Sequence, residues 1–130
     1  MVEEAKMDKK ILVVEDNPNN RKLIKDVLTY YGYEVIEATN GEEGINLARE
    51  HSPSLIIMDI QMPVMDGITA AKILKNDPLT KGIKMIALTS FAMKGDRERF
   101  IEAGFDDYLS KPIDTRQLPE IVKKYAGSEV

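Results

Sequence analysis

The chain of 130 residues contains no cysteine, no tryptophan and a single histidine. The lack of cysteine and the near lack of histidine exclude disulfide bonds, thiol catalysis and the usual zinc and iron–sulfur sites, whose ligands are these two residue types. Carboxylates therefore remain the only plausible metal ligands, and carboxylates favour a hard cation that is bound through oxygen.

Long apolar runs and an excess of positive charge are also missing. The longest hydrophobic stretches, such as 11–14 and 55–58, are far shorter than the roughly 20 residues that a membrane-spanning helix needs. The acidic start of the chain, Met1 to Glu4, does not resemble a secretory signal. With 18 lysine and arginine residues against 22 acidic ones, the net charge of −4 argues against binding nucleic acid through a basic surface. We therefore expect a cytoplasmic protein with no membrane and no nucleic-acid partner.

The sequence does contain a regular alternation of short apolar runs and amphipathic segments. Runs that are apolar at every position are typical of strands covered on both faces of a sheet. The amphipathic segments carry helix-capping sequences, with Asn17 before Pro18 and Asn40 three residues before Glu43. The pattern predicts strands near 11–14, 33–38, 55–58, 84–89 and 108–110, and helices between and after them, including 67–76, 92–103 and a last helix with Pro119 in its first turn. We expect one α/β domain: a doubly wound, five-stranded parallel sheet with helices on both faces.

Acidic residues follow two of the predicted buried strands. Glu15 and Asp16 come directly after the first strand, and Asp59 comes directly after the third. In a doubly wound sheet the carboxyl ends of neighbouring strands share one edge, so these three carboxylates converge there if the first and third strands are neighbours. At about 5 Å and an effective dielectric of about 20, each pair repels by roughly 3 kcal/mol, which favours recruitment of a cation such as magnesium. Any one of them, taken singly, could instead be a solvated or helix-capping acid.

A hydroxyl and an ammonium group are predicted at the same edge. Thr89 ends the fourth strand and Lys111 follows the fifth. A carboxylate nucleophile, a divalent cation, a lysine and a hydroxyl donor are together what phosphoryl transfer to an aspartate needs. Either residue alone would carry no such meaning, because lysine is common on surfaces and threonine is common at strand ends.

Taken in order, these residues resemble the receiver domain of two-component response regulators, over roughly residues 10–125. The matching motifs are Glu15-Asp16, Met58-Asp59, Met62-Pro63-Val64-Met65-Asp66-Gly67, Thr89-Ser90, Tyr108 and Lys111-Pro112. The segment Ser90 to Asp96 is most similar to receivers of hybrid kinases and to a single-domain regulator of cell division. The resemblance implies the flavodoxin-like strand order 2-1-3-4-5 and a receiver domain at 10–126, between an N-terminal tail, 1–9, and a C-terminal tail, 127–130.

The resemblance also implies a metal site and a phosphorylation site. Asp59 would be the phosphoacceptor. Magnesium would be held by Asp16, Asp59 and the main-chain carbonyl of Gln61, with Glu15 acting through water. Glu15 departs from the family pattern, in which many members have aspartate, but its longer side chain can still accept hydrogen bonds from that water.

Three further residues are given roles by the same resemblance. Lys111 would pair with the phosphoryl group, and its peptide bond to Pro112 would be cis. The Thr89 hydroxyl would bond to the phosphoryl group. Movement of Thr89 would leave space into which the ring of Tyr108 turns, so that Thr89 and Tyr108 form a switch.

The function implied is a single-domain response regulator. It would accept a phosphoryl group from a sensor histidine kinase or a histidine phosphotransfer protein. With only 127–130 left after the last helix, we expect it to signal to a downstream target protein through its own altered surface. It would not be an enzyme beyond catalysing its own aspartyl phosphorylation and dephosphorylation.

Other functions are weighed against this one. A phosphorelay intermediate, which passes the phosphoryl group on to a histidine phosphotransfer protein, would use the same residues and stays open. A phosphatase with an aspartate nucleophile is disfavoured, because no second acid follows two residues after Asp59 and the chain is too short for a cap domain. A nucleotide-binding module is disfavoured because no glycine-rich phosphate-binding loop follows the first strand.

Overall fold

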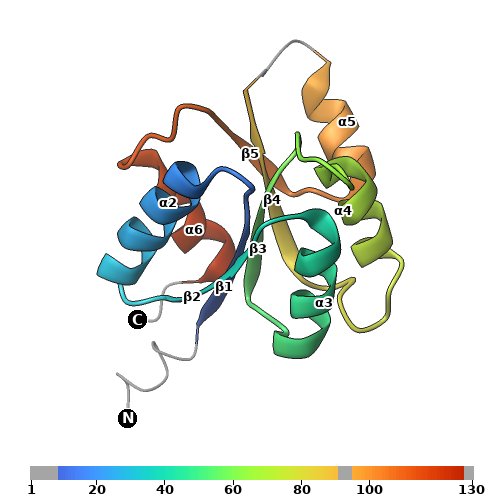
Figure 1. The fold of residues 1–130 in the computed structure, drawn as a ribbon, viewed down its shortest axis with the longest axis horizontal. Coiled ribbons are helices and arrows are strands. Elements are labelled where there is room, and N and C mark those ends of the chain that lie inside the picture. Colours follow the sequence, from blue (N-terminus) through green and yellow to red (C-terminus); the bar gives the residue numbers. More distant parts are fainter. Residues whose placement is uncertain (1–8, 91–94, 128–130) are drawn as a thin grey trace.

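A computed structural model describes residues 9–90 and 95–127 of the chain. Strands and helices alternate through this part (Figure 1). The elements are β1 (Lys10–Val14), α2 (Pro18–Tyr30), β2 (Glu34–Ala38), α3 (Gly41–His51), β3 (Leu55–Asp59), α4 (Gly67–Lys75), β4 (Lys84–Thr89), α5 (Asp96–Ala103), β5 (Asp107–Ser110) and α6 (Gln117–Ala126). Within the described residues, no helix has both the length and the apolar composition needed to cross a membrane.

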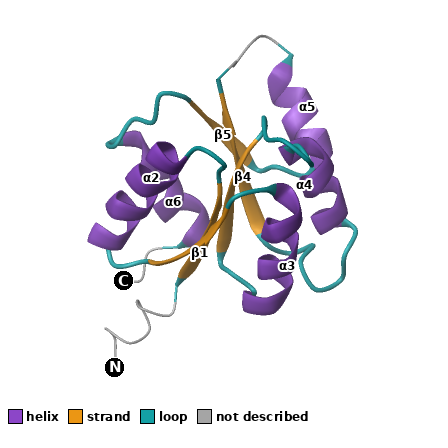
Figure 2. Ribbon diagram, in the orientation of Figure 1, coloured by secondary structure: helices purple, strands orange, loops and turns teal. Residues whose placement is uncertain are grey.

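The strands form one parallel sheet in the order β2-β1-β3-β4-β5, which confirms the predicted fold class and strand order. Helices α2 and α6 cover one face of the sheet, and α3, α4 and α5 cover the other (Figures 1 and 2). The sheet is therefore the middle layer of three, as strands that are apolar on both faces require.

Each face of the sheet has its own hydrophobic core. Successive residues of a strand point to opposite faces, so Leu12 and its register partner Ile56 pack under α3 and α4, whereas Ile11 and Ile57 pack under α2 and α6. All residues of β3 are buried. Because both central strands are held from two sides, the residues that follow them have well-defined positions.

Helix starts follow the predicted capping residues. Asn17 caps α2 immediately before Pro18, and the Asn40 side chain accepts a hydrogen bond of 2.8 Å from the Glu43 N–H at the start of α3. Pro119 lies in the first turn of α6, where a missing N–H leaves no helical hydrogen bond unmade. Capping side chains therefore set where α2 and α3 begin, whereas α5 and α6 begin without a side-chain cap.

One helix face differs from the prediction. The helical spacing of Leu23, Ile24, Val27, Leu28 and Tyr31 predicts one buried apolar stripe, but Leu23 is 37% exposed and Tyr31, which follows the last residue of α2, is 55% exposed. Only Ile24 and Leu28 are fully buried, because a single helix resting on a sheet buries a narrower stripe than its apolar residues cover.

Some expectations fall outside the described residues. They are the start of the fourth predicted helix at Ala92, the segment 91–94 of the subfamily resemblance, and residues 1–8 and 128–130 of the two tails. In the described part, α5 begins at Asp96, after Gly95 in a left-handed conformation.

The first and last described residues lie close together, away from the edge of the sheet where the carboxyl ends of the strands meet. The Lys9 ammonium donates a hydrogen bond of 2.9 Å to the main-chain oxygen of Ala126, which joins the start of β1 to the end of α6.

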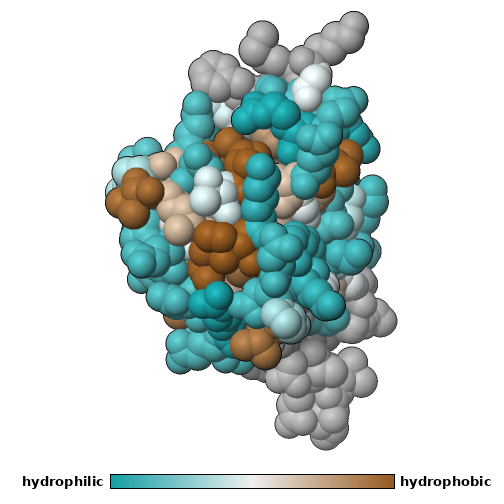
Figure 3. Space-filling model, turned by 90° about the vertical axis from the view of Figure 1, so that its right-hand side faces the viewer, coloured by the Kyte–Doolittle hydropathy of each residue, from teal (hydrophilic) through white to brown (hydrophobic). Residues whose placement is uncertain are grey.

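The side of the molecule that carries α4 and α5 is mainly hydrophilic with separate hydrophobic patches (Figure 3). Exposed apolar side chains on these helices are Ile73 and Ile101.

Candidate functional site

The ends of β1, β3, β4 and β5 bring the predicted site residues to one edge of the sheet. In the register of the strands, Val14 lies beside Met58, Asp59 beside Leu88, and Thr89 beside Ser110. The residues that follow these positions must therefore share the space beyond the sheet edge, which is where parallel α/β sheets bind ligands.

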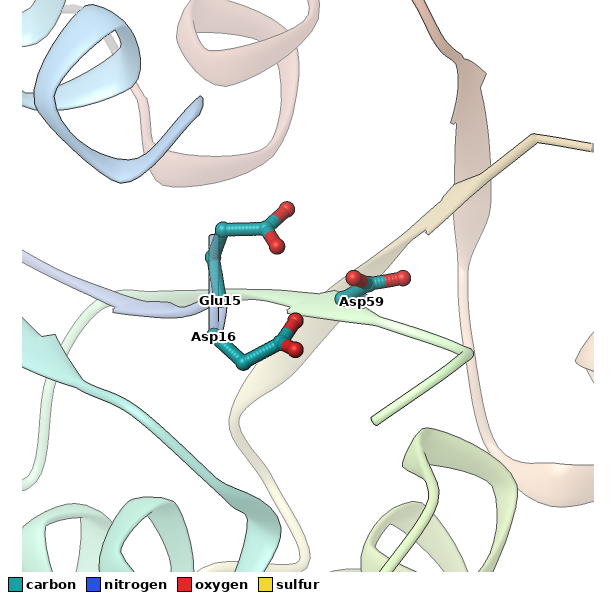
Figure 4. Close-up of side chains that lie close together, drawn as sticks. All are labelled: Glu15, Asp16 and Asp59. Atoms are coloured by element: carbon teal, nitrogen blue, oxygen red, sulfur yellow. The ribbon is translucent and has the colours of Figure 1, made fainter. Parts of the chain in front are cut away.

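Three carboxylates converge in this space, as the sequence predicted. Glu15, Asp16 and Asp59 each offer an oxygen atom, and these atoms all lie within 4.8 Å of one another. Figure 4 shows that they come from the ends of two neighbouring strands. Glu15 is buried and Asp59 is only 3% exposed, whereas Asp16 is exposed to solvent. The cluster is therefore open on the side of Asp16.

Lys111 bridges two of the three acids. Its Nζ atom lies 2.9 Å from Oδ2 of Asp59 and 3.0 Å from Oε1 of Glu15. The peptide bond between Lys111 and Pro112 is cis, in agreement with the resemblance. Burial disfavours the charged form of Lys111, but its contacts with the carboxylates of Asp59 and Glu15 and their negative charges outweigh burial and raise its pKa. Lys111 is therefore a fixed positive charge in the site.

Glu15 has an unusual environment for a carboxylate. Burial raises its pKa to about 7; the hydrogen bond from the Asn17 N–H opposes this rise and the charge of Asp59 adds to it. Its Oε2 atom accepts the Asn17 hydrogen bond at 3.0 Å. Its buried Oε1 atom faces Lys111 but accepts no hydrogen bond of good geometry from any residue that the structure describes.

The donor set fits a divalent cation. Three carboxylates face one ammonium group, so the fully ionised cluster has two uncompensated negative charges. All the side-chain donors are oxygen atoms, which hard cations prefer, and the buried Oε1 atom of Glu15 has unused acceptor capacity. A bound divalent cation would offset the repulsion from Asp59, which adds to the rise that burial causes in the pKa of Glu15.

The loop after β3 folds closely around Asp59. The main-chain N–H of Gln61 donates a hydrogen bond of 3.0 Å to Oδ1 of Asp59, which fixes the carboxylate. The loop closes with a hydrogen bond of 2.9 Å from Gly67 N–H to Ile60 oxygen. A Cβ atom at position 67 would overlap the main-chain oxygen of Asp59, so this close return requires glycine.

Thr89 and Tyr108 lie on the side of the site that faces α5. Thr89 is 3% exposed and lines a cavity of about 600 Å³ between the β3–α4 loop and α5. Tyr108 is half-buried, and its ring centre is 5.8 Å from that of Phe100 in α5. In the strand register Tyr108 pairs with Ala87, two residues before Thr89.

Two residues with contacts in the site were not predicted as part of it. Asn17 was recognised only as a helix cap, although its N–H also holds Glu15. Arg21 was given no role, but its Nη1 atom donates a hydrogen bond of 2.9 Å to the main-chain oxygen of Glu15. The position of Arg21 could have indicated this contact. Arg21 lies in the first turn of a helix that follows the acidic loop, and a long side chain at that position can extend back to the main chain of the loop.

Comparison with known proteins agrees with the fold and the acidic cluster. Residues 11–123 match the response regulator receiver domain family, and the chain belongs to that family. It is 47% identical over 121 residues to the polar-differentiation response regulator DivK of Brucella anthropi, an alignment that covers 93% of this chain and 98% of the relative.

Solved structures of receivers are also similar. The receiver domain of the Pseudomonas aeruginosa sensor histidine kinase PA1611, described with a magnesium ion coordinated in its active-site cleft, is 36% identical, with a TM-score of 0.84, over 92% of this chain and 98% of that one. The receiver domain of yeast Ssk1, solved in complex with the histidine phosphotransfer protein Ypd1, is 29% identical, with a TM-score of 0.85, over 91% of this chain and 88% of that one.

Proposed function

We propose that this receiver, comprising residues 10–126, takes a phosphoryl group from a phosphohistidine onto Asp59 and passes the signal on through its own surface. The donor is a sensor histidine kinase or a histidine phosphotransfer protein, and we place the reaction in the cytoplasm. The observation that carries the proposal is the nearly buried Asp59 carboxylate, held by Lys111 at 2.9 Å and grouped with two further acids.

Magnesium is the cation that we assign to the cluster. Asp16, Asp59 and the main-chain carbonyl of Gln61 would bind it directly, and Glu15 would act through water. The support is the surplus of negative charge and the unused buried acceptor of Glu15. When bound, magnesium supplies neutralisation of the negative charge that builds up between the carboxylates and the incoming phosphoryl oxygens.

The transfer itself is a displacement at phosphorus. An Asp59 carboxylate oxygen forms the new P–O bond as the P–N bond of the phosphohistidine breaks. The electron pair of the broken bond stays on the imidazole, which takes up a proton. Lys111, already in contact with Asp59, pairs with the phosphoryl oxygens, and the Thr89 hydroxyl donates a hydrogen bond to one of them.

The output step is a change of surface around α5, β5 and α6. The phosphoryl group brings about −1.5 to −2 charge and new acceptors, which draw Lys111 and Thr89 toward Asp59. The ring of Tyr108, now packed on Phe100, turns into the space that Thr89 leaves. The cavity beside Thr89 gives these side chains room to rearrange. A downstream protein then reads the altered surface.

The proposal is tested with a small phosphodonor such as acetyl phosphate in the presence of magnesium. Intact-mass measurement should show one added phosphoryl group that is labile to base, as an acyl phosphate is. Asp59→Asn should abolish the addition, whereas Asp77→Asn, which changes an aspartate in the loop between α4 and β4, should leave it intact. Persistent modification of the Asp59 variant at serine or threonine would refute the assignment.

A phosphorelay intermediate is the second candidate, and the structural likeness to a receiver solved with a histidine phosphotransfer protein favours it. The two functions differ in where the phosphoryl group goes next. Mixing the phosphorylated chain with a purified histidine phosphotransfer protein should move the label to histidine if the chain is a relay, and should leave it on Asp59 if the chain is a terminal regulator.

A further inference from the structure

The guanidinium group of Arg21 connects the acidic loop to two secondary-structure elements. From its position in α2, its Nη1 atom donates to the main-chain oxygen of Glu15 at 2.9 Å, and its Nε atom donates to Oε1 of Glu37 in β2 at 3.3 Å. The other oxygen of Glu37 pairs with Nζ of Lys25 at 3.2 Å. The contact with Glu37 therefore fixes the orientation of the Arg21 guanidinium group, which donates to the Glu15 carbonyl.

The main chain at Glu15 is fixed on both sides by these contacts. Its N–H donates a hydrogen bond of 3.0 Å to the Ala38 oxygen, which extends the β1–β2 ladder by one residue, and its carbonyl accepts from Arg21. The peptide plane between Glu15 and Asp16 contains that carbonyl and is thus held by Arg21, whereas the preceding peptide plane, between Val14 and Glu15, is held by β2.

The Asp16 side chain has no comparable support of its own. It is exposed, and no residue that the structure describes donates a hydrogen bond to it. The direction in which its carboxylate points therefore depends on the peptide plane that precedes it. Whatever fixes that plane also fixes one wall of the cation site.

We infer that Arg21 is a positioning residue for the cation site and that Glu37 orients it. The inference rests on the proposed function, because it presupposes that a cation binds at Asp16 and Asp59. Arg21 is an ion-paired arginine outside the carboxylate cluster. In this inference it increases the affinity for the metal ion, although its positive charge alone would lower that affinity.

The sign of the effect separates positioning from simple electrostatics. A positive charge near the site repels a divalent cation, so the loss of that charge alone should tighten binding. The loss of a support for Asp16 should weaken binding instead. A variant that removes both the charge and the support therefore shows which effect is larger.

The experiment is a calorimetric titration of the whole chain with magnesium chloride. Arg21→Gln should weaken binding by about tenfold, the lower end of what outer-shell contacts contribute at metal sites. Lys22→Gln is the matched control, because it removes the same charge from the next position of α2, where Lys22 pairs with the exposed Asp26. This control should bind as tightly as the wild type or slightly more tightly.

Two further variants test the geometry. Arg21→Lys keeps the charge, but a single ammonium group cannot reproduce the fork that reaches both Glu15 and Glu37, so it should also bind more weakly than the wild type. Glu37→Gln should also weaken binding several-fold, since it leaves Arg21 without its charged partner, but it removes a negative charge as well, so Arg21→Lys is the variant that separates geometry from charge.

A measurement without metal completes the test. The carbonyl carbon shift of Glu15 and the amide shift of Asp16 should change in Arg21→Gln and remain unchanged in Lys22→Gln, while denaturant unfolding confirms that both variants are folded. An Arg21→Gln variant that binds magnesium as tightly as the wild type, or more tightly, overturns the inference alone. A wild-type chain that binds no magnesium overturns the proposed cation site and this inference together.

Discussion

The carboxyl group of Glu15 is buried beside a second carboxylate, and this gives the metal-free protein a distinct dependence on pH. Its pKa is about 7 in the folded chain, above the ordinary value of 4.5, so between these values the folded state binds more protons than the unfolded state. Glu15 therefore contributes stability at low pH that is lost as the pH rises toward 7.

This dependence can be measured as a difference between two proteins. In metal-free buffer, the free energy of unfolding of the wild type minus that of Glu15→Gln should fall by on the order of 2 kcal/mol between pH 4.5 and 7. Urea unfolding at several pH values gives this difference. Saturating magnesium should reduce the fall, because a cation offsets the charge of Glu15. A difference that rises with pH would contradict the assigned environment.

Val64 has a backbone conformation that suits its side chain poorly. Its φ angle is 72°, in the left-handed region, and the side chain is 86% exposed. A β-branched residue is strained there, whereas asparagine adopts this conformation more readily. Val64→Asn should therefore raise the free energy of unfolding by about 1 kcal/mol, as measured by urea denaturation. Val64→Ile, which keeps the branched Cβ, should give no such gain.

Helix α6 is attached to the sheet by a hydrogen bond as well as by its apolar face. The hydroxyl of Tyr125 donates to Oδ2 of Asp107 in β5 at 3.0 Å, and burial together with this contact raises the pKa of Tyr125. Tyr125→Phe should lower the free energy of unfolding by about 1 kcal/mol. Tyr30→Phe, at an exposed position at the end of α2, is the control and should have no measurable effect.

At the scale of single elements, the sequence was most informative where one local signal sets the structure. The fully apolar strands and the capping residues Asn17 and Asn40 predicted element types and starts correctly. The sequence was less informative where the burial of a side chain depends on which other elements pack against its helix, as for Leu23 on α2. The positive φ angle of Val64 could not be predicted, because β-branched residues disfavour it and the close return of the loop imposes it.

The candidate site as a whole was predictable because parallel strands place their carboxyl ends together. The convergence of Glu15, Asp16 and Asp59 followed from that rule together with the strand order that the resemblance implied, which sets β1 beside β3. The contact between Arg21 and Glu37 could not be predicted, since it depends on the register that sets β2 beside β1 and on the rotation of α2 above them. Side-chain contacts between elements require coordinates.

The proposed switch makes a prediction for the whole molecule. Beryllofluoride with magnesium mimics an aspartyl phosphate, and its addition should change amide shifts at Thr89, at Tyr108 and along α5. The reason is that Tyr108 packs on Phe100 of α5, so that its rotation must alter the environment of that helix. Asp59→Asn should suppress all of these changes. Shifts confined to the loop after β3 would contradict the coupling through Tyr108.

The hydrogen bond between Lys9 and Ala126 has a consequence for the fusion of this domain to other proteins. It brings the two ends of the folded unit together at the amino-terminal edge of the sheet, opposite the acidic cluster (Figure 1). A unit whose ends adjoin can be inserted into an exposed loop of another protein without being pulled apart. A reporter joined directly before residue 9 or after residue 127 would likewise start away from the acidic cluster, so such fusions are expected to keep their capacity for phosphorylation.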